Sequence, residues 1–152
     1  MVTESIVIEE CSPARAFAVY LTIPEFEAGS QALAEFEGRL TEPSALLLVA
    51  RCADRDVGFK VGYDRYRDGS FYSWLGGVCP DYRGDRVAEH LLEAQESIVR
   101  TRGYRSICVK TRNRFTGMRV LLTKAGYRVV ALDMPRDVHD LDELRIVHVK
   151  SL

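Results

Sequence analysis

The sequence predicts an α/β fold of the α+β type, with a mixed, mostly antiparallel sheet of about six or seven strands flanked by about four helices. Two observations predict it. Three strand candidates follow one another with short charged turns between them, which is typical of an antiparallel meander. An amphipathic helix then leads to a further apolar strand, and such a crossover implies a mixed sheet with helices on both faces.

The N-terminal part is expected to contain one strand and two short helices. The strand is Ser5–Glu10. Ser12 and Pro13 mark the start of the first helix, because Ser is a preferred N-cap and Pro is favoured at the first helical position. The segment Ala32–Leu40 is expected to form the second helix.

The middle of the chain holds the meander and the amphipathic helix. Apolar runs predict strands at Ala45–Cys52, Val57–Tyr66 and Ser70–Cys79. Apolar residues at helical spacing predict a helix over Val87–Arg100, which Gly103 ends.

The C-terminal part supplies the remaining elements. Ser106–Thr111 is typical of a buried strand, and Phe115–Ala125 is expected to be a helix that ends before Gly126. The segments Tyr127–Leu132 and Leu144–Val149 are expected to complete the sheet.

Length and charge limit the classes of function. A chain of 152 residues fits one domain, so residues 1–152 are expected to form a single unit. The formal net charge is -1, from 21 basic and 22 acidic side chains, which argues against a dedicated nucleic-acid binder. No segment has the apolar length needed to cross a bilayer, so no membrane partner is expected.

The four cysteines (Cys11, Cys52, Cys79 and Cys108) are scattered along the chain and form no CxxC pair. A metal site is therefore not expected. Three of them lie in apolar, strand-like runs, where a reduced thiol that fills the core is the usual role. Reduced cysteines favour a cytoplasmic location.

The stretch from Gly77 to Leu92 gives the strongest indication of function, because an apolar strand there runs through a short polar loop directly into the amphipathic helix. The first amides of a helix have no intrahelical acceptor and the helix dipole adds positive potential, so the loop suits a phosphate. Gly84 allows close approach to the backbone, and Arg83 can add a charge-assisted contact. The alternative is a simple strand–turn–helix with a solvated arginine.

This loop, Arg83-Gly84-Asp85-Arg86-Val87-Ala88, resembles the acyl-coenzyme A loop of the GNAT (general-control-related N-acetyltransferase) enzymes, written Arg/Gln-x-x-Gly-x-Gly/Ala. Two later blocks, Asn113-Arg114-Phe115 and Leu122-Thr123-Lys124-Ala125-Gly126-Tyr127, look like the family's later helix and its closing Gly-Phe/Tyr, in the same order. The resemblance implies the GNAT fold, in which the strands Ser70–Cys79 and Ser106–Thr111 are parallel neighbours that splay apart at their C-terminal ends.

The resemblance also implies an activity. The expected function is an acetyl-CoA-dependent N-acetyltransferase that transfers an acetyl group to a primary amine of a small molecule or protein, by direct attack within a ternary complex. Acetyl-CoA is the expected cosubstrate, no metal is required, and a homodimer is left open. The alternative is a GNAT-fold module that binds acyl-CoA with weak or no catalysis, and a weaker one is a structural dimer that uses exposed strand edges.

The cofactor residues follow from the same resemblance. The backbone of Gly77 and Val78 would pair with the pantetheine arm, and Gly76 and Gly77 fit that role because missing side chains open a strand to a neighbour. Asn113 would hydrogen-bond the pantetheine amide, or would instead cap the helix that starts near Phe115. The pyrophosphate would be held by the amides of Arg83, Gly84, Asp85, Arg86, Val87 and Ala88.

Two positions depart from the family's pattern. Arg86 stands where the pattern has its first Gly, so its side chain either crowds the pyrophosphate or binds it. A right-handed helical backbone, which any residue can adopt at a helix start, would accommodate Arg86 there. Leu122 stands where many members carry a Tyr that acts as general acid, and the strand Ser70–Cys79 contains no carboxylate.

The catalytic candidates are therefore Tyr72, Ser73 or a water molecule. Tyr72 and Ser73 face opposite sides of their strand, so at most one points into a cleft from a regular strand. Phe71 and Trp74 are expected to fill the core.

The histidines and the acidic loop carry weaker indications. His90, His139 and His148 form no recognisable triad, and His90 is expected on the surface. The loop Asp137–Glu143 is either a solvated connection or a contributor to the site of a cationic acceptor.

Overall fold

The computed structural model describes residues 5–26, 32–134 and 139–152, and within them the chain forms a seven-stranded sheet in the order β1-β2-β3-β4-β5-β7-β6. The strands are β1 (Ile6–Glu10), β2 (Leu46–Cys52), β3 (Arg55–Tyr63), β4 (Ser70–Val78), β5 (Ser106–Arg112), β6 (Arg128–Asp133) and β7 (Arg145–Ser151). The α-helices are α1 (Pro13–Tyr20), α2 (Leu33–Arg39), α3 (Val87–Thr101) and α4 (Thr116–Lys124), and short 3₁₀ helices span Pro80–Tyr82 and Leu141–Glu143.

This architecture confirms the predicted fold class, and each predicted strand and helix is present with its ends shifted by a few residues. The largest shift is at the end of β3, which was expected to reach Tyr66 and stops at Tyr63. The Asp64 side chain accepts a hydrogen bond from the Arg67 amide at 2.9 Å and so starts the turn early.

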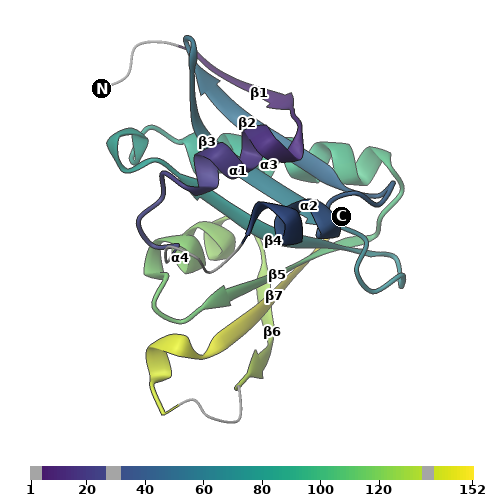
Figure 1. Cartoon of the computed structure of the whole chain (residues 1–152). Helices are drawn as coiled ribbons and strands as arrows, with labels where there is room; N and C mark the ends of the chain where they lie inside the picture. The colour runs from purple at the N-terminus through teal and green to yellow at the C-terminus, as the bar shows by residue number, and fades with distance from the viewer. Residues whose placement is uncertain (1–4, 27–31, 135–138) are drawn as a thin grey trace.

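The helices cover the two faces of the sheet. In Figure 1, α1 and α2 lie in front of the sheet and α3 lies behind it. The core on the α1/α2 side is built around aromatic and aliphatic residues that include Phe17, Phe36, Phe59 and Val61. The core on the α3/α4 side includes Phe71, Leu91, Ile107 and Leu122. Both faces of the central strands are therefore buried.

Strands β4 and β5 form the parallel pair of the described sheet, and they separate after a short contact. Their pairing runs from Ser70↔Ser106 to Ser73↔Val109, whereas β4 continues to Val78. Beyond that point β5 remains paired with β7. The predicted splay of the two strands is confirmed, and it leaves the second half of β4 without a strand partner on its β5 side.

A β-bulge lies where the splay begins. Val61 pairs with Leu75 and Gly62 pairs with Ser73, so Trp74 is an extra residue on β4. A Cβ at Gly62 would collide with the carbonyl oxygen of Tyr72, so the bulge requires glycine on the neighbouring strand. The bulge turns both Trp74 and Leu75 toward the α1/α2 side, where they pack on that core.

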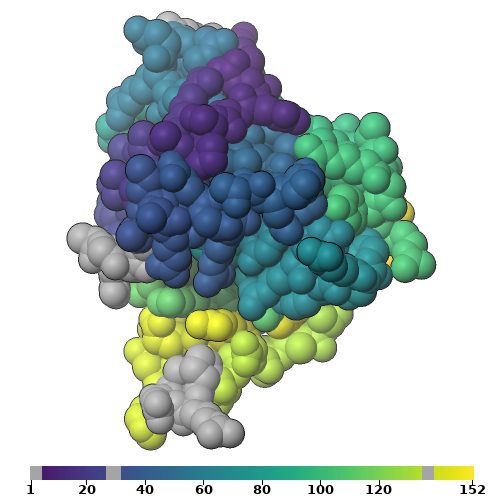
Figure 2. All heavy atoms as spheres, turned by 45° about the vertical axis from the view of Figure 1, so that its right-hand side comes forward, coloured from purple at the N-terminus to yellow at the C-terminus, as the bar shows by residue number. Residues whose placement is uncertain are grey.

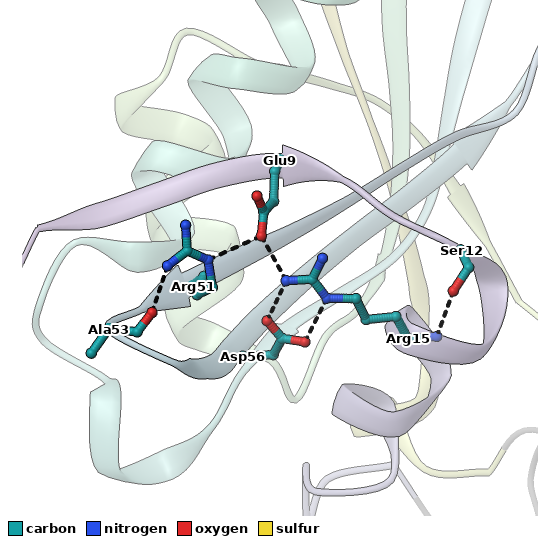
Figure 3. Close-up of polar contacts among 6 residues, drawn as sticks. All are labelled: Glu9, Ser12, Arg15, Arg51, Ala53 and Asp56. Atoms are coloured by element: carbon teal, nitrogen blue, oxygen red, sulfur yellow. Dashed lines mark hydrogen bonds and ion pairs between the residues drawn. The ribbon is translucent and has the colours of Figure 1, made fainter.

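The N-terminus of α1 is fastened to the sheet by a charged network (Figure 3). The Arg15 guanidinium donates to Glu9 of β1 at 2.6 Å and to Asp56 of β3 at 2.8 Å. This contact holds the pKa of the Asp56 carboxyl below its usual range. Ser12 accepts from the Arg15 amide at 3.2 Å, which makes it the predicted N-cap. The start of α1 is thereby held against β1 and β3.

Within the described residues, no helix is both long and apolar enough to cross a membrane.

Candidate active site

A cleft of about 1060 Å³ opens where β4 and β5 separate. Residues from distant parts of the chain line it. They include Arg39 of α2 and Arg145 of β7, as well as the start of α3. Figure 2 shows these two parts of the surface, with the N-terminal helices (purple to blue) above and the C-terminal strands (yellow-green to yellow) below. The cleft therefore passes through the sheet rather than lying on one face.

Most of the predicted site residues line this cleft. They are Tyr72, Ser73, Gly77, Val78, Arg83, Gly84, Arg86, Val87 and Ala88. The prediction that at most one of Tyr72 and Ser73 reaches the cleft assumed a regular strand with the cleft on one side. Both line it, because the cleft runs between two separated strands and is open to both faces. Asp85 and Asn113 are not among its lining residues.

The loop before α3 presents free backbone amides. Gly84 has φ +88° and Arg86, the N-cap of α3, has φ 62°. The amides of residues 84–88 have no acceptor among the described residues, and no side chain caps the helix. A Cβ on Gly84 would meet nothing within 4 Å, so nothing crowds the loop at that residue. Amides and helix dipole together make this an anion site.

Arg83 is turned away from this anion site. Its guanidinium donates to both carboxylate oxygens of Glu25, each at 2.6 Å, and its Nε donates to the Val78 carbonyl at 3.2 Å. Its amide donates to the Pro80 carbonyl at 3.2 Å. Arg83 thus ties the loop to the segment after α1 and holds the pKa of Glu25 below its usual range. The amide donors left for an anion begin at Gly84.

The backbone at Arg86 differs from the right-handed conformation considered from the sequence. Arg86 is left-handed (φ 62°, ψ 20°), a conformation that disfavours any residue with a Cβ. The Gly that the GNAT loop pattern has at this position would adopt the left-handed backbone without strain. The Arg86 side chain is 68% exposed and pairs with Glu89 at 2.8 Å, so it extends along the outside of α3.

Substituting Gly for Arg86 is expected to raise the melting temperature by roughly 2–4 °C, because relief of one left-handed non-glycine residue gives a shift of that size in a domain of this length. Arg86→Ala is the matched control, since it removes the same side chain and ion pair but keeps the Cβ. Thermal unfolding followed by circular dichroism measures both. A gain for Ala equal to that for Gly, or no gain for Gly, would show that the backbone at residue 86 is unstrained.

Two glycines on β4 border the splay. A Cβ at Gly77 would meet the terminal methyl of Ile23 at 2.5 Å, so Ile23 would have to shift to admit a side chain there. A Cβ at Gly76 would approach the Phe59 carbonyl at 3.3 Å and Lys60 at 3.4 Å. Side chains stand perpendicular to a sheet, so these glycines do not themselves open its edge. The edge is open because β5 has left it.

Asn113 lies at the end of β5 and is held there by two hydrogen bonds. Its Nδ2 donates to the Leu141 carbonyl at 3.1 Å, and its own carbonyl accepts from Arg119 at 3.0 Å. The N-cap of α4 is Phe115, which makes no side-chain cap, so the capping alternative is wrong. Asn113 holds the end of β5 against the segment before β7.

Tyr72 and Ser73 lie at the base of the splay, 5% and 2% exposed. Burial raises the pKa of Tyr72 above its ordinary value of 10.0, so its hydroxyl stays protonated at neutral pH. That hydroxyl has no hydrogen-bond partner among the described residues. Phe71 fills the core as predicted, whereas Trp74 is only half-buried and lines the cleft because of the bulge.

Few described side chains of the cleft can act as a general acid or a general base. Leu122 is fully buried, so no donor stands in the family's tyrosine position. The described lining residues include two carboxylates, Glu25 and Glu89, and each is paired with an arginine. A free carboxylate base is therefore not part of the described cleft.

Lys60 also lines the cleft, although it is not among the site residues predicted from the sequence. It lies on β3 opposite Gly76, is 6% exposed, and has no ion pair among the described residues. Burial lowers the pKa of its ammonium to about 8, although the charge of Glu96 acts in the opposite direction. A lysine in this state loses its proton far more readily than one on the surface.

The histidines and the acidic loop contribute structure in the described residues. His90 is exposed on α3, and its Nδ1 lies 2.7 Å from the Arg86 carbonyl. His148 is 1% exposed in β7, and burial lowers its pKa. Asp137 and Val138 lie outside the described residues, but Glu143 of the same loop pairs with Arg112 at 2.8 Å and with Arg114 at 3.5 Å. The Glu143 carboxylate is thus paired with two arginines of the protein itself.

The described residues contain no group of three or more His, Cys, Asp or Glu side chains placed to hold a metal ion.

No protein-family model matches the chain, and no curated protein matches its sequence. Solved structures do match its fold. The ribosomal-protein-S18-alanine N-acetyltransferase from Escherichia coli has a TM-score of 0.81 at 15% identity, over 97% of this chain and 94% of that one. Ard1 from Thermoplasma volcanium has a TM-score of 0.77 at 22% identity, over 97% of each chain.

A GCN5-related N-acetyltransferase from Kribbella flavida has a TM-score of 0.80 at 16% identity, over 97% of this chain and 98% of that one. These likenesses cover almost the whole of each chain. Together with the seven-stranded sheet and four helices described above, they show that this chain has the GNAT acetyltransferase fold.

Proposed function

We propose that the protein is an acetyl-CoA-dependent N-acetyltransferase that acylates a primary amine by direct attack within a ternary complex. The observation that carries the proposal is the second half of β4, which has no strand partner on its β5 side and lies next to the free amides at the start of α3. The matched structures from E. coli and K. flavida are named as N-acetyltransferases, which supports the same class of activity here.

The residues of the cleft fit acetyl-CoA in two places. The backbone of Gly77 and Val78 can pair with the amides of the pantetheine arm, as a strand pairs with an extended peptide. The amides of Gly84, Val87 and Ala88 have no acceptor among the described residues and can hold the pyrophosphate. Between these two places lies the base of the splay, with Tyr72 and Ser73, where the thioester would be presented.

The transfer forms one bond and breaks another. The neutral amine nitrogen bonds to the thioester carbonyl carbon, the carbon–sulfur bond breaks, the amine loses a proton, and coenzyme A leaves as the thiol. Tyr72 is proposed to protonate the departing sulfur, because its hydroxyl is protonated and has no other partner among the described residues. The proton that the amine loses passes to solvent, and solvent restores the proton of Tyr72. Positioning of the two substrates supplies much of the remaining rate.

The alternative is a module that binds acyl-CoA with weak or no turnover. Leu122 at the family's tyrosine position and the pairing of Glu25 and Glu89 favour it, because no conventional acid or base is present in the described cleft. Binding without release of coenzyme A thiol, tested against a panel of primary amines, would support this alternative.

The first test is calorimetry with acetyl-CoA on the parent protein and on Gly84→Val. A bulky side chain in front of the free amides is expected to weaken binding by at least about 1 kcal/mol, or roughly fivefold in Kd. Gly103→Val is the matched control, because Gly103 lies beyond the opposite end of α3, has φ +92° and faces equally open space. Equal affinities for the two variants would place the phosphates elsewhere.

A cytoplasmic location is proposed on the basis that Cys11, Cys52, Cys79 and Cys108 form no disulfide. A homodimer is proposed as the state that would cover β6, the edge strand, on which Val129, Val130 and Leu132 are all more than half exposed.

A further inference from the structure

Besides Lys60, whose ammonium is buried near Glu96, three cations in the cleft lack a carboxylate partner among the described residues. They are Arg39 of α2, Arg65 of the β3–β4 turn and Lys110 of β5. Among the residues that the structure describes, nine basic and two acidic side chains line the cleft, and the acidic ones are already paired. Other arginines of the lining have carboxylate partners, as Arg112 and Arg114 do in Glu143. The cluster of Arg39, Arg65 and Lys110 therefore stands out by its unbalanced charge.

Each cation of this cluster lies against an aromatic ring. The guanidinium of Arg39 lies 4.9 Å from the ring centroid of Trp74, and that of Arg65 lies 5.1 Å from Tyr72. The Lys110 ammonium lies 5.9 Å from Tyr66. Cation–π contacts hold long side chains in place without neutralising them. The rings thus keep three positive charges positioned but available to a ligand.

The cluster lies on the α1/α2 side of the sheet. Tyr72 and Lys110 alternate along their strands with Phe71 and Val109, which belong to the core on the α3/α4 side. The bulge turns Trp74 to the α1/α2 side as well. The free amides at the start of α3 lie beyond the other end of β4, so the cluster and the proposed phosphate site are separate parts of the cleft.

We infer that the cluster binds the anionic end of the acceptor, and that the acceptor is a small primary amine carrying a carboxylate or phosphate group. The inference rests on the proposed function for its reaction, but the binding step is independent of acetyl-CoA. An amine without such a group meets three uncompensated like charges. An amine with one brings an oxygen group that the planar forks of Arg39 and Arg65 bind well.

The same charges assist the chemistry. Positive groups near an ammonium lower its pKa and so raise the fraction of neutral, nucleophilic amine. The described cleft has no free carboxylate base, so this effect replaces part of what a base would do. The anionic group holds the acceptor in place, and the positive charge that it leaves unpaired lowers the pKa of the amine.

Binding can be measured without acetyl-CoA, because Trp74 is the single tryptophan of the chain and lies under Arg39. The probes are two matched pairs: 4-aminobutanoate with 4-aminobutanamide, and O-phosphoethanolamine with ethanolamine. At low salt, the member of at least one pair that carries the anionic group is expected to change Trp74 fluorescence with a Kd at least fivefold below that of the member that lacks it. The pair that responds distinguishes carboxylate from phosphate.

The variants Arg39→Gln and Arg65→Gln are each expected to raise the Kd of the anionic probe at least threefold. Arg128→Gln is the matched control, since it removes one charge from β6 outside the cleft. Equal affinities for the members of both pairs, no response to any probe at tens of millimolar, or an Arg128→Gln effect as large as that of Arg39→Gln would overturn the inference.

Turnover with acetyl-CoA separates this inference from the proposed function. The anionic amines are expected to show the higher kcat/KM in each pair. Charge-selective binding with no acetylation of any amine would leave the anion site standing and contradict the transferase. Acetylation of neutral and anionic amines at equal kcat/KM would keep the transferase and overturn the anion site.

Discussion

Replacing Lys60 by Met is expected to raise the free energy of unfolding at pH 7 by about 3 kcal/mol. Burial lowers the pKa of Lys60 to about 8 from an ordinary value of 10.5, and each pKa unit corresponds to about 1.4 kcal/mol of differential stability. Met has a similar length and no charge to desolvate. Glu96, the nearby carboxylate, keeps its ion pair with Lys150 at 2.9 Å, so the substitution leaves no orphaned charge.

The stability that Lys60→Met gains over the parent should decrease as the pH rises. Below pH 8 the ammonium is charged in both the folded and the unfolded chain, so the full cost of burying it is present. Between pH 8 and 10.5 the folded protein has lost the proton and the unfolded chain still binds it, so the parent becomes more stable as pH rises. Above 10.5 the parent and Lys60→Met should have nearly equal stability.

Urea unfolding at pH 7 and at a pH above 10.5 measures this difference, with Lys124→Met as the control because Lys124 is exposed on α4. A parent-to-variant difference that is the same at both pH values would show that Lys60 is not a buried ammonium. A loss of acetyl transfer in Lys60→Met alongside the gain in stability would indicate that the cleft retains the lysine for its activity, since function is the usual reason to keep a destabilising group.

The fold was predictable because its elements are encoded locally. Ser12 specifies the start of α1 as its N-cap, and Pro13 does so through the fixed φ of its ring at the first helical position. Both residues occupy these positions in the structure. The meander follows from apolar runs with short turns between them. The splay of β4 and β5 is different, because no periodicity specifies it, and it was expected only from the resemblance to GNAT enzymes.

The site was less predictable because its geometry depends on contacts between distant residues. The Arg83–Glu25 pair joins residues 58 positions apart and removes Arg83 from the anion site. The alternation of Phe59, Lys60 and Val61 is typical of a strand with one solvated face, but helices cover both faces here, so Lys60 is buried. The bulge at Trp74 depends on Gly62 of the adjacent strand.

The largest kinetic effect is expected from Tyr72→Phe, which should lower kcat for acetyl transfer roughly 10²- to 10³-fold, the range typical of losing a general acid. Burial keeps the Tyr72 pKa above 10.0, so the hydroxyl carries a proton wherever the protein is assayed near neutrality. A thiolate that leaves without a proton must instead be protonated by water. The affinity for acetyl-CoA should change little, because the hydroxyl has no part in the phosphate or pantetheine contacts proposed above.

Two variants make this prediction specific to the Tyr72 hydroxyl. Tyr66→Phe removes the same hydroxyl from a ring 5.8 Å away that does not line the cleft, and it should keep kcat within about twofold. Ser73→Ala should cost less than about tenfold, because a serine hydroxyl is far too weak an acid to protonate a thiolate and retains only a hydrogen-bonding role. Steady-state release of coenzyme A thiol measures all three. If Ser73→Ala loses more activity than Tyr72→Phe, the proton reaches the sulfur through Ser73 or a water that it holds, and Tyr72 serves as a wall of the cleft beneath Arg65.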